Sequence, residues 1–482
     1  MCAAPSLVWF RHDLRIDDNP ALQAAVQRGG PVIPVFIWAP QEELPWAPGA
    51  ASRWWLHQSL LHLDGDLREV GARLIIRNGK SLAELQRLID ETGADSVFWN
   101  RRYEPAVIAR DATVKAALRA RKIVAESFNS NLLFEPWEIA TRERKPFQVF
   151  TAFWRACLAA SQPPLPLARP AILPAPGRWP NSKALAQLQL EPRTDWAAGL
   201  RATWQPGTAG AERCFQTFLE QAATDYKTSR DLPGEPGTSR LSPHLHFGEI
   251  SPRRVWHEFL SSMSAMTSQG AVQSAEFFLR ELGWREFAHH LLFHFPHTVQ
   301  SPLRTKFARF PHKNDPAMIE AWQRGRTGYP IVDAGMRELW HTGWMHNRVR
   351  MISASFLVKD LLASWLIGAK WFWDTLVDAD LANNTLGWQW TAGCGADAAP
   401  YFRIFNPVTQ SQKFDPRGHY LRRWLPEIER LPDKWLHQPW LAPRSVLHEA
   451  GIHPGTTYPS PLIEHAAARR DALDAFSSIG CD

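Results

Sequence analysis

Short apolar runs bounded by polar or turn residues recur through the first 130 residues, and helical patterns separate them. Such runs are typical of buried parallel strands. Asp18, Asn19 and Pro20 form a good helix start, because a capping residue precedes a proline at the first helical position. The alternation predicts an α/β domain with an open, Rossmann-like parallel sheet of five strands and right-handed crossovers. The expected strands are 6–10, 32–38, 73–77, 96–100 and 122–128, and the expected helices lie near 20–28, 51–70, 81–92 and 105–120.

The strand pattern disappears beyond Ala211, where apolar residues recur at helical spacing, so the second domain is expected to be mostly α-helical. Nine of the 38 prolines fall within 161–210, which is typical of a long connector. We therefore expect an α/β domain over 1–130, a connector over 131–210 and a helical domain over 211–482. The helices expected in the second half are 211–225, 251–262, 271–294, 330–340, 343–366 and 369–378.

Composition narrows the classes of function without selecting one. The chain has 482 residues, with 54 Lys and Arg against 48 Asp and Glu. Its five cysteines include no Cys-x-x-Cys pair, which disfavours a disulfide framework or a zinc site and suits a reducing, cytoplasmic compartment. The N-terminal residues lack a signal-peptide pattern, and the longest mostly apolar stretch, 361–373, is too short to span a membrane.

Two further features bear on nucleic acids and nucleotides. Residues 301–350 carry nine Lys and Arg against four acids, which nominates this region for phosphate contacts, although such clusters are usually solvated faces. Neither of the usual glycine-rich phosphate loops follows a strand in the first half. The α/β domain therefore either binds a ligand in another way or serves as a platform.

Glu281 is the first candidate for chemistry. In the helix expected over 271–294, it shares a face with Trp284 by its three-residue spacing. One interpretation is an ion pair with Arg280 or Arg285 at an amphipathic boundary. The other is a carboxylate that lines a cavity beside an indole, where a flat heteroaromatic ligand could stack and accept or donate hydrogen bonds.

A later helix repeats this arrangement, because Asn347, Arg350 and Met351 share one of its faces. Asp378 and Asp380 follow, with no third ligand at metal spacing, so no metal is expected. Pairing with Arg350 and hydrogen bonding to a hydroxylated ligand suit these acids better.

The 24 tryptophans exceed what core filling needs, since a buried indole N–H must find a partner. Trp388 and Trp390, which flank a glutamine, could stack on bases or relay single electrons, and the pattern does not separate these tasks. The loop over 226–242 is rich in hydroxyls and carries Arg230 and Arg240. It could hold a diphosphate without a Rossmann fingerprint, although a loop of this composition is more often only a turn.

Several long motifs in order resemble the photolyase/cryptochrome family, and the likeness covers nearly the whole chain. It is strongest to the bacterial cyclobutane pyrimidine dimer photolyases of class I or class III. The resemblance implies a light-driven lyase in which excited reduced FAD donates an electron to the dimer, the cyclobutane ring splits and the electron returns. A cryptochrome-type blue-light photoreceptor without repair is the alternative. The motifs are Gly237-Thr-Ser-Arg-Leu-Ser-Pro243, Trp284-Arg-Glu-Phe287, Gly328-Tyr-Pro-Ile-Val-Asp333, Gly343-Trp-Met-His-Asn-Arg348 and 378–390.

The same resemblance implies that the helical domain holds FAD in a bent conformation. Asn384 would face the flavin N5, where an amide favours a reduced flavin because it does not readily give up a proton. Arg350 would pair with Asp378 beside the isoalloxazine. FAD contacts are implied for Tyr226, Thr238, Ser239, Arg240, Leu241, Ser242, Phe278, Arg350, Asp378, Asp380 and Asn384.

The implied partner is DNA that contains pyrimidine dimers, with the dimer flipped out of the duplex by a protein that acts as a monomer. Trp284 and Trp390 would pack on its rings, and Glu281 would stabilise the thymine radical anion by hydrogen bonding. DNA or dimer contacts are implied for Arg230, Glu281, Trp284, Asn347, Arg348, Met351, Trp390 and Arg403.

One departure from the family concerns photoreduction. The family's chain of three tryptophans corresponds here to Trp388, Trp365 and His312, and histidine is a poor one-electron donor. We therefore expect either slow photoreduction or a different outermost donor. The candidates are Trp322, Trp340 and Tyr329.

The antenna differs as well, because the folate-contacting Asn-Glu pair of one subgroup falls on Ala106 and Val107 here. The expectation is 5,10-methenyltetrahydrofolate bound in the class III manner, or no antenna at all.

Overall fold

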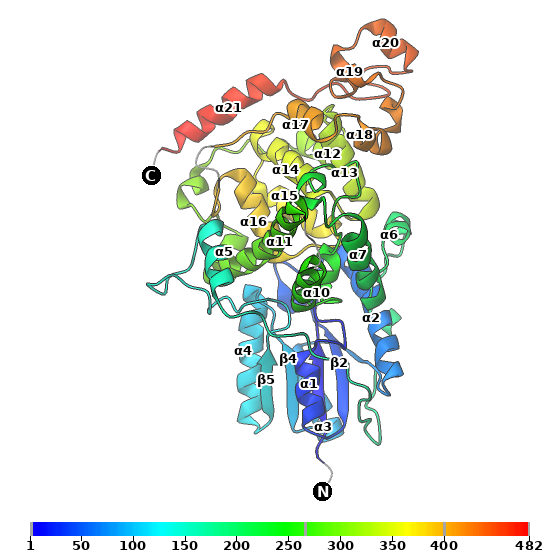
Figure 1. Cartoon of the computed structure of the whole chain (residues 1–482), viewed down its shortest axis with the longest axis vertical. Helices are drawn as coiled ribbons and strands as arrows, with labels where there is room; N and C mark the ends of the chain where they lie inside the picture. The colour runs from blue at the N-terminus through cyan, green and yellow to red at the C-terminus, as the bar shows by residue number, and fades with distance from the viewer. Residues whose placement is uncertain (1–2, 265–267, 399–401, 481–482) are drawn as a thin grey trace.

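The computed structural model of the protein describes residues 3–264, 268–398 and 402–480. An α/β domain lies at one end, and a larger helical domain packs on it and extends to the last helix (Figure 1). The α/β domain contains a five-stranded sheet of order β3-β2-β1-β4-β5, and every pairing is parallel, as predicted. The strands are β1 (Ser6–Phe10), β2 (Val32–Trp38), β3 (Ile75–Asn78), β4 (Ser96–Asn100) and β5 (Val124–Phe128).

Alternate residues of each strand feed two separate cores, since successive side chains point to opposite faces of a sheet. In β1, Val8 and Phe10 pack in one core, whereas Leu7 and Trp9 pack in the other. Asn19 caps the first helix by accepting from the Leu22 N–H at 3.1 Å. The helices of this domain are α1 (Pro20–Gln27), α2 (Ala50–Glu69), α3 (Ser81–Thr92) and α4 (Pro105–Ala120).

Two strands begin later than predicted, for local reasons. Lys122 has a positive φ of 61° in the turn after α4, so the extended backbone of β5 starts at Val124. The Leu74 N–H donates to the Asp64 side chain at 2.8 Å instead of to a neighbouring strand, and β3 starts at Ile75.

Beyond the sheet, the structure is helical, as expected. Its helices are α5 (Phe150–Ala159), α6 (Ala198–Thr203), α7 (Thr208–Gln221), α8 (Tyr226–Ser229), α9 (Ser242–Phe247), α10 (Pro252–Ser264), α11 (Gln269–His294), α12 (Pro316–Gln323), α13 (Pro330–Thr342), α14 (Asn347–Ser355), α15 (Trp365–Thr375), α16 (Leu381–Ala392), α17 (Pro407–Phe414), α18 (His419–Trp424), α19 (Asp433–Leu436), α20 (Arg444–Glu449) and α21 (His465–Ser478). Short 3₁₀ turns are η1 (Pro40–Glu43), η2 (Leu185–Leu188), η3 (Pro296–Val299), η4 (Thr305–Arg309), η6 (Pro426–Ile428) and η7 (Pro439–Leu441).

The single helix predicted over 343–366 is wrong, because the chain forms two helices there. His346 caps α14 by accepting from the Arg348 N–H at 3.2 Å, so this helix begins at Asn347. It passes into a π-helical turn, η5 (Phe356–Asp360), and Leu362 then adopts a left-handed φ of 50°. The next helix, α15, begins at Trp365, earlier than predicted.

The two domains are joined by buried polar contacts. Arg253 of α10 pairs with Asp18 at 2.6 Å, and the Trp55 indole N–H of α2 donates to Glu249 at 3.1 Å. Gly248 has a φ of 68°, and a Cβ there would lie 2.3 Å from the His12 carbonyl oxygen. This close approach requires glycine at the interface.

Candidate functional site

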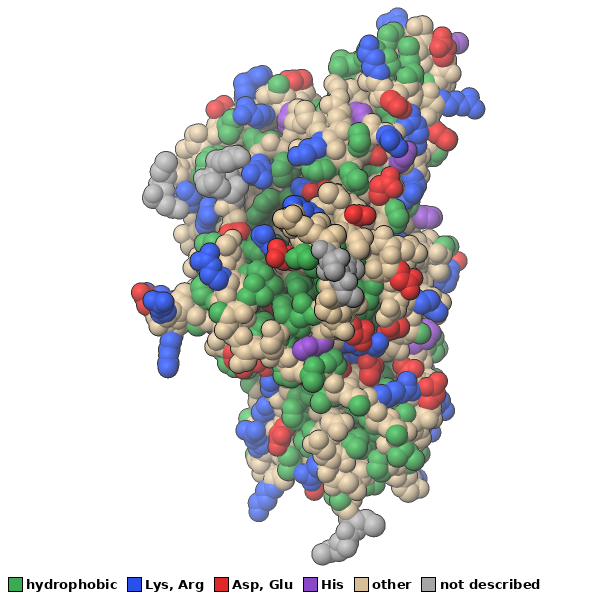
Figure 2. Space-filling model, in the orientation of Figure 1, with side chains coloured by type: hydrophobic (Ala, Val, Ile, Leu, Met, Phe, Trp, Pro, Cys, Tyr) green, Lys and Arg blue, Asp and Glu red, His purple; other side chains and the backbone are tan. Residues whose placement is uncertain are grey.

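A cavity of about 700 Å³ opens in the helical domain, between α8, α9, α11, α14 and α16. Figure 2 shows a hollow lined mostly by hydrophobic side chains on this domain, with charged side chains at its edge. Trp365 does not line the cavity but is buried in the same core as Trp388. Every other predicted site residue does line it: Tyr226, Arg230, Thr238, Ser239, Arg240, Leu241, Ser242, Phe278, Glu281, Trp284, Asn347, Arg348, Arg350, Met351, Asp378, Asp380, Asn384, Trp388, Trp390 and Arg403.

The hydroxyl-rich loop before α9 holds one cation in a fixed position. Arg240 has a left-handed φ of 52°, and its guanidinium lies 4.9 Å from the Trp204 ring and 4.7 Å from the Trp344 ring. The Trp344 indole N–H also donates to the Ser242 hydroxyl at 3.3 Å. An arginine clamped between two indoles has little freedom left to lose when an anion binds, which suits a diphosphate.

Arg350 and Asp378 form an ion pair in the cavity wall, in which one guanidinium nitrogen contacts both carboxylate oxygens. The Arg350 Nη2 donates to the two Asp378 carboxylate oxygens at 3.1 and 2.8 Å, and its Nε donates to the Met345 carbonyl at 2.7 Å. Asn384 of α16 is held as well, because its side-chain amide donates to the Ala369 carbonyl at 3.0 Å. These contacts hold the Arg350 guanidinium, the Asp378 carboxylate and the Asn384 amide in place on one wall of the cavity.

Asp380 lies where the cavity meets the α/β domain. Its Oδ1 caps α16 by accepting from the Asn383 N–H at 2.8 Å, and its Oδ2 lies 3.4 Å from His289 and 3.8 Å from His246. Burial opposes the charge on Asp380, but His289 and His246 hold its pKa well below the usual range. The His12 ring, from the α/β domain, packs edge-on against His246 at 4.7 Å.

The partner of Glu281 is Arg230 of the segment after α8, and not Arg280 or Arg285 as expected from helix spacing. Arg285 instead donates to the Asn131 carbonyl at 2.5 Å, and Arg280 lies over the Phe150 ring. The interpretation of Glu281 as an ion-pair partner of Arg280 or Arg285 is therefore wrong, whereas Glu281 does line the cavity.

Trp284 and Trp390, the two indoles of the cavity wall, are linked through Phe150 and Asp397. Trp284 stacks on Phe150 of α5, with ring centroids 3.7 Å apart and planes 8° from parallel. The Phe150 N–H donates to the Asp397 carboxylate at 3.4 Å, and the Trp390 indole N–H donates to the Asp397 carbonyl at 3.1 Å. One face of Trp284 is therefore covered from behind, while the ring also lines the cavity.

Trp388 is surrounded by other aromatic rings. Its centroid lies 4.9 Å from Phe372 and 6.2 Å from Trp322, and Gly368 packs so closely on the indole that a Cβ would lie 2.0 Å from it. Trp322 is completely buried. Trp340 is 64% exposed and stacks on Trp371 with centroids 6.0 Å apart.

The remaining photoreduction candidates lie elsewhere in the helical domain. Tyr329 packs on Trp440 at 5.2 Å, and burial raises its pKa to about 12. His312, at the position of the family's outermost tryptophan, contacts Phe310 at 5.2 Å.

The basic region at 301–350 is not a single phosphate-binding face. Lys313 pairs with Asp471 at 2.8 Å, Arg324 with Glu320 at 2.9 Å, and Arg337 with Glu427 at 2.7 Å. Of this region's basic residues, Arg348 and Arg350 line the cavity. The charge count does not register such pairs, whose members are far apart in the sequence for Lys313 and Arg337 and one helical turn apart for Arg324.

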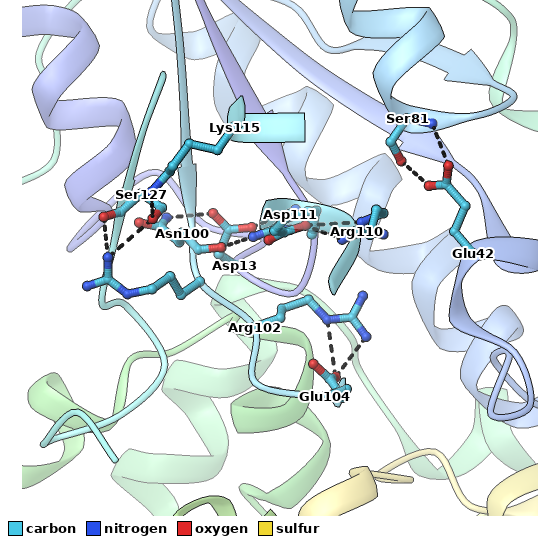
Figure 3. Close-up of polar contacts among 12 residues, drawn as sticks. Asp13, Glu42, Ser81, Asn100, Arg102, Glu104, Arg110, Asp111, Lys115 and Ser127 are labelled. Atoms are coloured by element: carbon cyan, nitrogen blue, oxygen red, sulfur yellow. Dashed lines mark hydrogen bonds and ion pairs between the residues drawn. The ribbon is translucent and has the colours of Figure 1, made fainter. Parts of the chain in front are cut away.

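A second polar cluster lies at the carboxyl ends of β1 and β4 (Figure 3). Asn100 donates to the Asp13 carboxylate at 2.6 Å, and Arg11 pairs with Asp111 at 2.6 Å. Arg102 pairs with Glu43 at 2.8 Å. Val107, at one antenna-subgroup position, is fully buried in α4.

Sequence reasoning missed several residues that shape the cavity. Asp231 could have been noticed as an acid directly after Arg230, and Trp344 lies inside a quoted motif. No local sequence pattern marks Trp204, Phe150 or His289, because each of them contacts a cavity residue that is far away in the sequence.

Neither a metal site nor a membrane helix is found where the structure is described. Within 3–264, 268–398 and 402–480, no group of three or more His, Cys, Asp or Glu is arranged to hold a metal ion. No helix in these ranges is long and apolar enough to cross a bilayer.

The fold and the cavity together define a class: proteins in which a helical domain with a dinucleotide-sized cavity is joined to a parallel α/β domain. Residues 6–171 match the family model "DNA photolyase", and residues 278–478 match "FAD binding domain of DNA photolyase". The chain belongs to the DNA photolyase/cryptochrome family, and its helical half is an FAD-binding domain.

Several relatives match over almost the full chain. A deoxyribodipyrimidine photo-lyase of Agrobacterium fabrum is 47% identical, covering 99% of this chain and 98% of the relative. Cryptochrome-1 of Arabidopsis thaliana is 43% identical, covering 98% and 70%. The crystal structure of a bacterial class III photolyase from Agrobacterium tumefaciens superposes with a TM-score of 0.95 at 47% identity, covering 99% and 98%.

Proposed function

We propose that this protein is a deoxyribodipyrimidine photo-lyase of class III, which repairs cyclobutane pyrimidine dimers in DNA by light. The observation that carries this proposal is a single cavity that joins two sets of residues. Glu281, Trp284 and Trp390 form a wall suited to the two joined pyrimidine rings of the lesion, and Asn384 and Arg350 lie in the part suited to the cofactor. Full-length similarity to photo-lyases supports it.

The residues present fit FAD. The clamped Arg240 and the hydroxyls of Thr238, Ser239 and Ser242 would hold its diphosphate, and Asp378 would accept from its hydroxyl or imide donors. Phe278 and Tyr226 would pack against its apolar surface. When bound and reduced, FAD supplies the electron that light drives into the dimer.

The protein's own task is then to bind, orient and stabilise. Trp284 and Trp390 stack on the flipped dimer and exclude water, with Met351 and Asn347 beside them. Glu281, kept in place by Arg230, hydrogen-bonds the dimer where negative charge develops. Arg230, Arg348 and Arg403 contact phosphates at the opening, which supplies affinity that does not depend on base sequence.

Asn384 favours repair over signalling. Its amide N–H₂ group is engaged by the Ala369 carbonyl, and an amide has no proton to give up in the ordinary pH range. A cryptochrome-type photoreceptor is the second candidate, because Arabidopsis cryptochrome-1 is nearly as similar as the photo-lyase. The presence of Glu281, Trp284 and Trp390 together in the cavity wall favours the photo-lyase.

The test is to illuminate the reduced holoprotein with a dimer-containing oligonucleotide and to measure intact thymine by chromatography. Repair should require light and should be absent in matched dark samples. Bound FAD together with unchanged dimers after illumination would contradict the enzyme and leave the photoreceptor.

For photoreduction, we propose that Trp388 receives an electron by way of Trp365, which is buried in the same core, and that Trp322 is the candidate outer donor, with its ring centroid 6.2 Å from that of Trp388. Transient absorption of the oxidised holoprotein should show a long-lived tryptophan radical that is lost in Trp388→Phe. Retention of that radical in the variant would exclude this route, whereas repair by chemically reduced protein needs no such relay.

Two finer proposals concern the state of the protein. The first is that the protein acts as a monomer. An antenna of 5,10-methenyltetrahydrofolate, as in the resemblance to class III, would be identified by mass spectrometry of the chromophores released from purified protein. Release of FAD alone would exclude it.

A further inference from the structure

Four charged side chains alternate in sign in a row at the rim of the cavity: Glu281, Arg230 and Arg348 line the cavity, and Asp231 lies between the two arginines. Arg230 Nη1 donates to Glu281 Oε1, and its Nε lies 3.9 Å from Asp231 Oδ1. Arg348 Nη2 donates to the same Asp231 oxygen at 2.8 Å. The row carries no net charge, although its two arginines are the groups expected to meet phosphates.

Asp231 is the carboxylate that holds Arg348. The Arg348 guanidinium lies 4.4 Å over the Phe414 ring, and its Nε is buried without a hydrogen-bond partner in the described part of the chain. Burial lowers the pKa of the adjacent His346 to about 4, so that ring is neutral and adds no positive charge. A phosphate approaching Arg348 must therefore compete with Asp231.

We propose that Asp231 is an internal counter-ion that lowers the affinity of the rim for the DNA backbone. This inference rests on the proposed function. A phosphate gains little at Arg348, because it must break one charge-assisted hydrogen bond to form another of the same kind. Undamaged and dimer-containing DNA both meet this cost, but a dimer that enters the cavity also stacks on Trp284 and Trp390. Tight binding then depends on the lesion and not on the backbone alone.

The test compares Asp231→Asn with Glu235→Gln in the FAD-loaded protein. Glu235 is a neighbouring acid that lies 3.5 Å from His419 and makes no ion pair with Arg348. Both variants change the net charge equally. Fluorescence anisotropy would measure binding of a short undamaged duplex and of the same duplex carrying one thymine dimer, at several salt concentrations.

We expect Asp231→Asn to bind the undamaged duplex at least about threefold more tightly than Glu235→Gln, as removal of a competing charge predicts. The dimer-containing duplex should gain by a similar factor, because the cost at Arg348 is the same for both ligands. The slope of log affinity against log salt should steepen by up to roughly 0.9, the value of one freed phosphate contact. Asp231→Glu, which keeps the carboxylate, should bind both duplexes with wild-type affinity and salt dependence.

Two results would overturn the proposal: equal binding of undamaged DNA by Asp231→Asn and Glu235→Gln, or weaker binding of both duplexes by Asp231→Asn. The second would mean that Asp231 holds Arg348 in its productive position. A wild-type protein without preference for the dimer would contradict the proposed function instead. The undamaged duplex would still test the counter-ion, because that measurement involves no lesion.

Discussion

Polar side chains gather at two places in the molecule, and the two are built differently. At the carboxyl ends of β1 and β4, Asp13 accepts from Asn100 and Arg11 pairs with Asp111, and these groups are almost completely buried (Figure 3). In the helical domain, charged groups such as Arg350 are also paired but line a cavity of about 700 Å³.

The carboxyl edge of a parallel sheet is the usual ligand site of an open α/β fold. Here most polar groups at that edge pair with one another, although Arg11 Nε and Glu104 Oε2 have no hydrogen-bond partner among the described residues, whereas those around the cavity leave room for a cofactor and a lesion. A polar cluster can bind a ligand only when a cavity lies next to it. The fold class alone would have predicted the site in the α/β domain, whereas the cavity of about 700 Å³ lies in the helical domain.

The sharpest way to separate the two regions is to remove one arginine from each. Arg11→Met should lower the free energy of unfolding by up to about 3 kcal/mol, because it breaks a buried pair although Arg110 remains beside Asp111, yet it should leave the FAD content unchanged. Arg350→Met should also destabilise the protein, because it leaves the Asp378 carboxylate, which is 4% exposed, without its arginine, but it should lower the FAD content strongly. Thermal unfolding and flavin absorbance measure the two effects.

Arg324→Met is the control for this comparison. The pair of Arg324 with Glu320 is well exposed and should contribute about 0–1 kcal/mol to the free energy of unfolding. Full FAD content in Arg350→Met, or FAD loss in Arg11→Met at temperatures where it is folded, would break the distinction between a structural and a functional cluster.

Glu281 tests whether the cavity wall acts in the reaction. Glu281→Ala should lower the quantum yield of repair by roughly half or more while changing dimer affinity less, because the lost hydrogen bond matters most when charge develops. Yield and affinity are measured on the same reduced samples. An unchanged yield would exclude this role, and Glu281→Gln, which keeps a hydrogen-bonding group, should retain more activity than Glu281→Ala.

Phe150 tests whether the support behind the wall matters. Phe150→Leu keeps an apolar side chain but loses the flat face under Trp284, so dimer binding should weaken by about 0.5–1.5 kcal/mol. Phe153→Leu is the matched control, since Phe153 is equally buried in the same core and packs on Phe287 and His290. Equal losses in both variants would mean general core damage and no specific support.

The smallest effect concerns the point where the two regions meet. Burial opposes protonation of His289, but Asp380 raises the pKa of His289 above its usual 6.5. A group whose pKa is higher in the folded than in the unfolded state stabilises the protein at pH values below its unfolded pKa. This stabilisation is lost as the pH rises through the folded pKa.

The stability difference between wild type and His289→Gln should therefore be larger at pH 6 than at higher pH, as thermal unfolding would measure. His12, His246 and Glu104 also face Asp380, and Arg102 lies beside His12 and Glu104; all four are unchanged in the variant. A difference that does not vary with pH would assign His289 a packing role only.

The fold could be predicted well because its signals are local. Short apolar runs gave five strands, and the Asn19 cap marked the start of α1. The candidate residues of the cavity were also found, although mostly through motifs and not through spacing. The break of the helix after Ser355 had no such signal, because a π-helical turn differs from an α-helix in hydrogen bonding and not in hydrophobic pattern.

Helical spacing can relate Glu281 only to residues three or four positions away, and it therefore suggested Arg280 or Arg285. Packing of α8 against α11 instead brings Arg230 to Glu281 across 51 residues. Phe150 reaches Trp284 in the same way. Local patterns thus decide which segments are helices or strands and which of their faces are buried. The choice of partner for each charge and each ring belongs to the tertiary structure, because it depends on distances between segments that no periodicity encodes.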